Sequence, residues 1–294
     1  MGVQKVHAKC VDLLRLACCQ FDVAFGDPGA NAARAVETIH RLAGDGINFV
    51  VFPEAFLTGY CVGTQKGAEE LAIEVTAHNG HEITQAAKPL QRIQQACVEA
   101  GVHAVVGFAG NNHMDLYNGA ALIRDDGVML RYIKTHLPIL GFDRFAMKGH
   151  DLPVFETRFG RIGMIICYDL RPPEAARVLA LKGADLIVLP TNWPEGAEVS
   201  AEYIAKVRAI ENRVFLATCN RVGTEGEFTF IGLSKIIDPA GNVLASAGPE
   251  EAIIRADLDL SSARNKHIVI RENEYELALF GCRTPELYGQ ITEQ

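Results

Sequence analysis

The chain has 294 residues, of which 49% are hydrophobic and 22% charged, and its 28 Lys and Arg against 36 Asp and Glu give a net charge of −8. This length and composition exclude a disordered, collagen-like or coiled-coil protein, and they allow one large α/β domain or two small ones. Because the net charge is negative, we expect neither nucleic acid nor a membrane as partner, but a globular protein that acts on a small molecule.

The first half of the chain alternates short runs rich in Val and Ile with longer stretches of helical period, which is typical of βαβ units. This pattern predicts strands at 14–21, 47–52 and 103–108 and helices at 31–42 and 86–100. Residues 120–124 and 128–133 flank Asp125-Asp126-Gly127 and are predicted to pair as a hairpin. We therefore expect antiparallel strands mixed into a partly parallel sheet.

The second half repeats the alternation and contains no low-complexity linker that would separate domains. Strands are predicted at 161–167, 185–190 and 214–220, helices at 172–182 and 200–212, a hairpin from 230–237 and 242–247, and an extended run at 252–258.

The cysteines and the apolar runs suggest where the protein resides. The N-terminal apolar run at 13–19 is interrupted by Arg15, and no stretch approaches the roughly 18 apolar residues of a spanning helix. The eight cysteines show no CxxC spacing and lie mostly in apolar runs, so we interpret seven of them as buried free thiols. Free thiols are typical of a reducing compartment, and we expect a cytoplasmic protein.

Three chemically active side chains stand where predicted strands end. Cys167 precedes a predicted helix, whose first N–H groups favour a thiolate and can bind an oxyanion. Glu54 follows an apolar strand, where burial can raise its pKa and make it a general base near neutral pH. Lys134 follows the second hairpin strand. Each has a structural alternative: a core thiol, a helix N-cap and a surface cation.

Together these segments resemble the nitrilase superfamily, the carbon–nitrogen hydrolases. P-loop, dinucleotide-binding, zinc-protease and serine-hydrolase motifs are absent from the sequence. The segments that carry the resemblance are Phe52-Pro53-Glu54, Tyr132-Ile133-Lys134-Thr135-His136-Leu137 and Cys167-Tyr168-Asp169-Leu170-Arg171-Pro172-Pro173-Glu174. The resemblance implies an α/β fold, a four-layer α-β-β-α sandwich, with a single domain at residues 13–289 after an N-terminal extension of residues 1–12.

The resemblance also implies a mechanism. Cys167 would be the nucleophile, Glu54 the general base, and Lys134 the cation that stabilises the tetrahedral oxyanion, with no metal or organic cofactor. Many members carry a second glutamate between the lysine and the cysteine, and Asp143 stands in its place here. The alternative for Asp143 is a loop residue paired with Arg144.

The Cys-Tyr-Asp elbow resembles the amidases more than the true nitrilases, which implies hydrolysis of a small primary amide to carboxylate and ammonia through a Cys thioester. The alternatives are an N-carbamoyl amidohydrolase, a nitrilase and a non-catalytic binding member. A homodimer or larger homo-oligomer is implied as well. The expected substrate-binding residues lie in or beside family site segments, and core packing is the alternative for three of the aromatic ones (Tyr60, Phe145 and Trp193); the set is Tyr60, Asp143, Phe145, Tyr168, Asn192 and Trp193.

Overall fold

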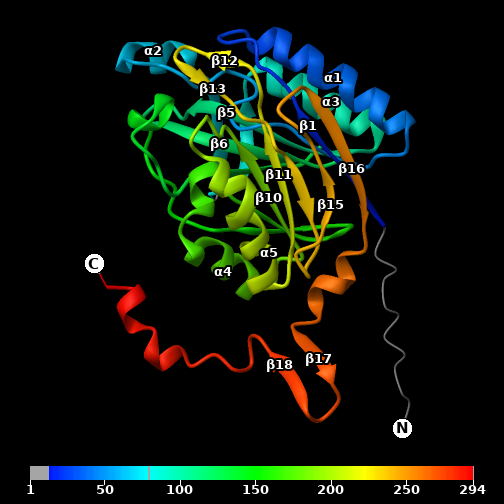
Figure 1. Ribbon diagram of the computed structural model, residues 1–294. Helices are drawn as coiled ribbons and strands as arrows, with labels where there is room; N and C mark the ends of the chain where they lie inside the picture. Colours follow the sequence, from blue (N-terminus) through cyan, green and yellow to red (C-terminus); the bar gives the residue numbers. More distant parts are fainter. Residues whose placement is uncertain (1–12, 79, 294) are drawn as a thin grey trace.

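The computed structural model describes residues 13–78 and 80–293, and in these residues two large β-sheets carry helices on their outer faces (Figure 1). The N-terminal extension predicted for residues 1–12 lies outside the described residues. None of the helices in the described ranges is long and apolar enough to cross a membrane.

The larger sheet mixes parallel and antiparallel strands, as expected. Within the described residues its order is β16 (Ala252–Leu258), β1 (Leu14–Gln20), β2 (Phe49–Val51), β5 (His103–Asn111), β3 (Ile73–His78), β4 (Glu82–Ala86), β7 (Met129–Ile133) and β6 (Leu116–Ile123). β1, β2 and β5 run parallel, β16 pairs antiparallel with β1, and β5 also pairs antiparallel with β6. The predicted hairpin at 120–133 is the β6–β7 pair.

The smaller sheet has a parallel centre and antiparallel edges. Its order is β15 (Val243–Ser246), β14 (Lys235–Ile237), β11 (Phe215–Asn220), β10 (Leu186–Thr191), β9 (Gly160–Met164) and β8 (Val154–Thr157). β9, β10 and β11 run parallel, whereas β8, β14 and β15 pair antiparallel. The carboxyl ends of β9 and β10 therefore lie at one edge, where Cys167 and Asn192 follow.

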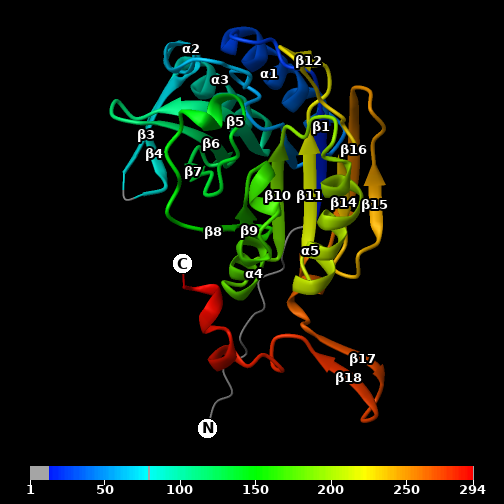
Figure 2. The ribbon, with the colours of Figure 1, turned by 60° about the vertical axis from the view of Figure 1, so that its left-hand side comes forward.

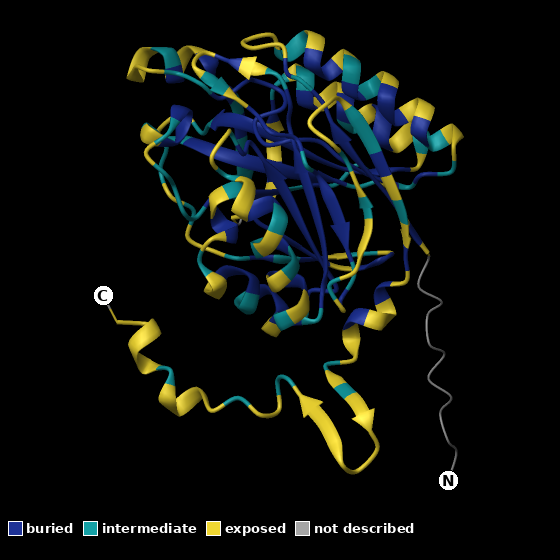
Figure 3. Ribbon diagram, in the orientation of Figure 1, coloured by how far each residue is buried: buried dark blue, intermediate teal, exposed yellow. Residues whose placement is uncertain are grey.

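Three apolar cores separate four layers. Between the sheets, Leu16 and Val105 of the larger sheet pack in one cluster with Ile162 and Val188 of the smaller sheet. A second core joins the larger sheet to α1 (Pro28–Gly44) and α3 (Lys88–Ala100), and a third joins the smaller sheet to α4 (Pro173–Leu181) and α5 (Ala205–Asn212). Figure 2 shows the two helix pairs on opposite sides, and Figure 3 shows buried strands between helices with exposed outer faces. The predicted α-β-β-α sandwich is confirmed.

Helix α1 illustrates how the sequence builds an outer layer. The Asp27 side chain accepts a hydrogen bond from the backbone N–H of Ala30, and Pro28 occupies the first turn, where its missing N–H costs nothing. The buried residues follow helical spacing and turn one face to the sheet: Asn31, Ala32, Ala35, Thr38, Ile39 and Leu42.

Several elements differ from the predictions. The strand predicted at 161–167 ends at Met164, because a 3-10 turn, η2 (Cys167–Leu170), follows. The helix predicted at 200–212 begins as a π-helical turn, η3 (Ser200–Ile204), before α5. Some short elements, or elements polar on one face, were not predicted, among them α2 (Gln65–Leu71), the β3–β4 pair, β8, and the hairpin of β12 (Thr224–Glu225) and β13 (Phe228–Thr229).

The C-terminal segment leaves the sandwich after the single turn η4 (Leu260–Arg264). It forms an exposed hairpin of β17 (His267–Arg271) and β18 (Tyr275–Ala278) and the turns η5 (Pro285–Leu287) and η6 (Gly289–Ile291), which extend away from the layers (Figures 1 and 3). Two cysteines correct the interpretation of seven buried thiols: Cys282 of this segment is exposed, and Cys61, between β2 and α2, is only half-buried. Cys10 lies outside the described residues. The remaining cysteines apart from Cys167 are buried: Cys18, Cys19, Cys97 and Cys219.

Candidate active site

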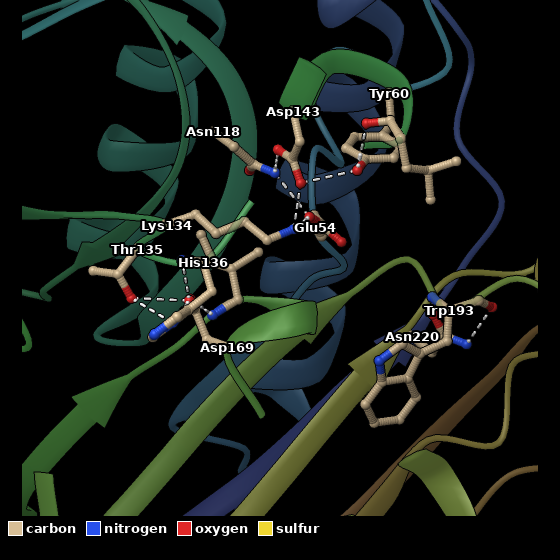
Figure 4. Close-up of polar contacts among 12 residues, drawn as sticks. Glu54, Tyr60, Asn118, Lys134, Thr135, His136, Asp143, Asp169, Trp193 and Asn220 are labelled. Carbon is tan, nitrogen blue, oxygen red and sulfur yellow. Dashed lines mark hydrogen bonds and ion pairs between the residues drawn. The ribbon is translucent and has the colours of Figure 1, made fainter. Parts of the chain in front are cut away.

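Glu54, Lys134 and Cys167 follow three different strands of the two sheets, and they lie close enough for their charges to interact. Glu54 follows β2 and Lys134 follows β7 in the larger sheet, whereas Cys167 follows β9 in the smaller one. Lys134 Nζ lies 2.7 Å from Glu54 Oε1, and both side chains are buried (Figure 4). The charges of Glu54 and Lys134 both act on the Cys167 thiol, in opposite directions.

The backbone around Glu54 depends on a close approach of β5. Ala55 has a φ of +48°, and the N–H of Leu57 donates to the carbonyl of Gly107 in β5 over 3.1 Å. A Cβ atom on Gly107 would lie 2.5 Å from both Pro53 O and Ala55 N. Only glycine lets the strand pass this close to the turn that carries Glu54.

Asp143 is the second carboxylate on Lys134. It lies in the 3-10 turn η1 (Gly141–Arg144), and its Oδ2 atom is 2.6 Å from Lys134 Nζ, with no exposure of either side chain. Tyr60, the predicted pocket residue, places its hydroxyl 2.9 Å from the same Oδ2 atom. The structure thus brings Asp143 to Lys134, whereas the alternative was a loop residue paired with Arg144.

Asn118 completes this cluster and was not predicted. Its Nδ2 atom donates to Glu54 Oε1 and to Asp143 Oδ1, both over 2.8 Å, and so bridges the two carboxylates (Figure 4). Its backbone carbonyl also accepts from the Lys134 N–H at 2.9 Å. A single amide side chain within the otherwise apolar strand β6 was the available signal.

The electrostatics of the cluster follow from burial and pairing. Burial raises the pKa of Glu54, and the Asp143 carboxylate raises it further, against the opposing effect of Lys134. Burial would lower the pKa of Lys134, but the carboxylates of Asp143 and Glu54 outweigh it, so the pKa lies well above its usual value. Lys134 is therefore charged at neutral pH.

Cys167 sits in a strained elbow and carries a neutral thiol. Its φ of +47° is unusual for a residue with a side chain, and such strain is often found at functional sites. Burial and the Glu54 carboxylate raise its pKa to about 12, although Lys134 lowers it. The thiol is thus protonated at neutral pH and lies in the field of a carboxylate of raised pKa.

Asp169 ties the elbow to the strand that carries Lys134. Its carboxylate is buried and accepts from the Ile166 N–H at 2.9 Å and the Tyr132 hydroxyl at 2.7 Å. It also accepts from the His136 N–H and the Thr135 hydroxyl, at 2.8 Å and 2.9 Å (Figure 4). One carboxylate thereby fixes the residues that follow β7 against those that follow β9.

The remaining predicted substrate-binding residues occupy different surroundings. Tyr168 is partly exposed beside Cys167, and Asn192 is buried with no hydrogen-bond partner for either amide atom within the described part of the chain. Phe145 packs beside Tyr60 and lines a cavity of about 470 Å³ next to α2. Trp193 lies in the core between the smaller sheet and its helices, apart from the Glu54–Lys134 cluster (Figure 4), and its role as a pocket wall remains a prediction.

The chemistry that the cluster offers is that of a thiol, a carboxylate base and a fixed cation. Within residues 13–78 and 80–293, no group of three or more His, Cys, Asp or Glu side chains is arranged to hold a metal ion. Glu54 Oε2 has no hydrogen-bond partner among these residues, which leaves it available to a proton donor.

Comparison with known proteins identifies the family. The carbon–nitrogen hydrolase profile matches residues 15–267. Similar sequences include a probable nitrilase of Schizosaccharomyces pombe (32% identity, 94% of this chain and 97% of that protein) and a 2-oxoglutaramate amidase of Bacillus subtilis (32% identity, 84% and 92%). An N-carbamoylputrescine amidase of Solanum tuberosum is 31% identical, with 94% of each chain covered.

Among solved structures, a cysteine-to-alanine mutant of a Nesterenkonia amidase from the nitrilase superfamily superimposes with a TM-score of 0.77. It covers 95% of this chain and 97% of that one at 23% identity, so it supports the fold. The sequence profile, the relatives above 30% identity and the shared sandwich agree, and the chain belongs to the carbon–nitrogen hydrolase family.

Proposed function

We propose that this protein hydrolyses a small primary amide to a carboxylate and ammonia through a thioester on Cys167. The observation that carries the proposal is the buried cluster in which Lys134 lies 2.7 Å from Glu54 and 2.6 Å from Asp143, within electrostatic reach of a strained cysteine. A nucleophile, a base and a fixed cation are the groups that acyl transfer requires.

Acylation begins from the neutral thiol. Because the pKa of the Cys167 thiol is about 12, Glu54 takes the thiol proton as the sulfur attacks the amide carbon. The negative charge that develops on the amide oxygen is received by the Lys134 ammonium and by the backbone N–H of Tyr168. Glu54 then returns the proton to the departing nitrogen, which leaves as ammonia.

Deacylation uses the same groups in the second half of the cycle. Glu54 accepts a proton from a water molecule that attacks the thioester carbon, and Lys134 again stabilises the oxyanion. Collapse of this intermediate expels the Cys167 thiolate, which recovers its proton from Glu54. Hydrogen bonds from Asn118 and to Asp143 keep Glu54 and Lys134 in fixed positions through both steps.

The substrate is expected to bind against Tyr60, Asp143, Phe145, Tyr168, Asn192 and Trp193. The two unpaired amide atoms of Asn192 support a substrate with a polar group beyond the scissile amide. The similarity to a 2-oxoglutaramate amidase supports a small linear amide. The similarity to an N-carbamoylputrescine amidase favours, as second candidate, a carbamoyl substrate that releases carbon dioxide with ammonia.

A substrate panel tests these proposals. Purified protein is incubated with linear primary amides and with N-carbamoyl amines and amino acids, and ammonia and carbon dioxide are measured. We expect ammonia without carbon dioxide, and loss of turnover in Cys167→Ala with an unchanged circular dichroism spectrum. Full turnover in that variant would overturn the assignment of the nucleophile, whereas equal amounts of the two gases would establish the carbamoyl reaction.

We also propose a cytoplasmic homo-oligomer that needs no metal or organic cofactor. An exposed apolar row along η3 and α5, together with the exposed apolar side chains of β17 and β18, supports self-association. The row consists of Val199, Tyr203, Val207 and Ile210.

A further inference from the structure

A buried ion pair outside the catalytic cluster contacts the loop that carries Tyr60. Glu225 belongs to β12 and Arg221 follows β11; their side chains are 6% and 1% exposed and are hydrogen-bonded to each other. Arg221 also lies 2.9 Å from Asp22 and stacks over the ring of Phe230, with 4.4 Å from its guanidinium carbon to the ring centre. The pair is thus anchored on several sides.

The Glu225 carboxylate is hydrogen-bonded to the backbone of the loop that carries Tyr60. Its Oε1 atom accepts hydrogen bonds from the N–H groups of both Tyr60, at 2.7 Å, and Cys61. A Cβ atom on Gly59, whose φ is +87°, would lie 3.2 Å from Glu225 Oε2 and still closer to Phe25, so the loop packs directly on the carboxylate. A charged acceptor for two neighbouring backbone amides is a strong and directional anchor.

Tyr60, whose backbone is held by Glu225, contacts the catalytic cluster directly. The Tyr60 carbonyl accepts from the N–H of Phe142 at 2.8 Å, and the Tyr60 hydroxyl lies 2.9 Å from Asp143 Oδ2. Asp143 in turn lies 2.6 Å from Lys134. An unbroken series of contacts therefore runs from Glu225 through Tyr60 and Asp143 to Lys134.

The same hairpin region is also hydrogen-bonded to the segment that carries Trp193. The N–H of Ile231 donates to the carbonyl of Trp193 at 3.0 Å, and the N–H of Glu195 donates to the carbonyl of Thr229 at 3.0 Å. The β12–β13 hairpin and the residues that follow it are therefore hydrogen-bonded to the segment that follows β10 in the smaller sheet and, through Glu225, to the segment that follows β2 in the larger sheet.

We propose that Glu225, held by Arg221, is a positioning residue that sets Tyr60 and Asp143 against Lys134 and so fixes the substrate amide for attack. The proposal rests on the function proposed above. Since a misplacement of about 1 Å can cost roughly 100-fold in rate, release of the loop should affect turnover without removing any reacting group.

Glu225→Gln is the main variant, and Glu227→Gln, an exposed residue of the same hairpin, is its control. We expect kcat/KM for the best amide of the panel to fall roughly 10- to 100-fold in Glu225→Gln and to stay at the wild-type value in Glu227→Gln. Labelling of Cys167 by methyl methanethiosulfonate, which has no amide group, should keep its wild-type rate in both. A merely structural role would leave the kinetic constants per folded molecule unchanged and would overturn the proposal.

A double variant tests the route of the effect. Because Glu225 acts through Tyr60, adding Tyr60→Phe to Glu225→Gln should cost no more than the larger single loss, whereas additive losses would overturn the proposal. If Glu225→Gln does not fold, Glu225→Asp replaces it: the charge facing Arg221 is kept, but the shorter side chain cannot also reach both amides. Wild-type kinetics in Glu225→Asp would then overturn the proposal. An active Cys167→Ala variant would refute the proposed function instead, so the two failures are distinguishable.

Discussion

The Glu54→Gln variant should separate amide turnover from the reactivity of the Cys167 thiol. The substitution keeps the shape of the side chain but removes its capacity to take a proton. Lys134 retains its 2.6 Å pair with Asp143, so the cation stays in place. The expected loss is therefore that of the base alone.

The expected fall of kcat/KM in Glu54→Gln reflects the raised pKa of the Cys167 thiol, which leaves few thiolates without a base. With a pKa of about 12, only about one Cys167 in 10⁴ is ionised at pH 8, which corresponds to a cost of about 5 kcal/mol for attack by a preformed thiolate. General base catalysis typically contributes 10²- to 10⁴-fold, so we expect kcat/KM to fall by roughly that factor.

Thiol labelling should respond in the opposite direction. The Glu54 carboxylate raises the pKa of Cys167, so its removal lowers that pKa and increases the thiolate fraction at alkaline pH. Ammonia release and methyl methanethiosulfonate labelling are measured from pH 6 to 10 in a Cys282→Ser background, because Cys282 is exposed. Glu227→Gln serves as the matched control. Amide turnover within about tenfold of wild type in Glu54→Gln would refute the role of Glu54 as base.

Three further predictions test the site, the fold and the assembly. Turnover requires ionised Glu54, so kcat/KM should rise with pH through a pKa above the usual carboxyl range. Asp143→Asn removes a charge that raises the pKa of Glu54, so the rise should move to lower pH. An unmoved pH profile would contradict this coupling. Gly107→Ala puts a Cβ atom 2.5 Å from backbone atoms on both sides of Glu54 and should lower the free energy of unfolding in urea by about 1–3 kcal/mol. Gly44→Ala, with open space at its Cβ, should leave it unchanged. Equal unfolding midpoints for the two variants would refute the packing argument. Val207→Lys in the exposed apolar row should reduce the sedimentation coefficient if that face joins the subunits, and an unchanged oligomer places the interface elsewhere.

Many strands and helices of the sandwich could be predicted because their signals are local, whereas the four-layer arrangement was implied by the family resemblance. Buried runs such as those of β1 and β10, the capped α1 and the Asp-Asp-Gly turn between β6 and β7 each carry their pattern within a few residues. The short β12–β13 hairpin carries no such pattern, since its residues serve contacts with other segments rather than a core face.

The sequence alone predicts Glu54, Lys134 and Cys167 as the catalytic residues, because each stands at the end of a recognisable strand within a family motif. The groups that surround these three residues depend on how the chain folds in three dimensions. Asn118 lies 64 residues from Glu54 in the chain, and Glu225 lies 165 residues from Tyr60, yet both are in hydrogen-bond contact. No local pattern encodes such pairs, because they arise when the loops at the ends of two separately built sheets are packed together.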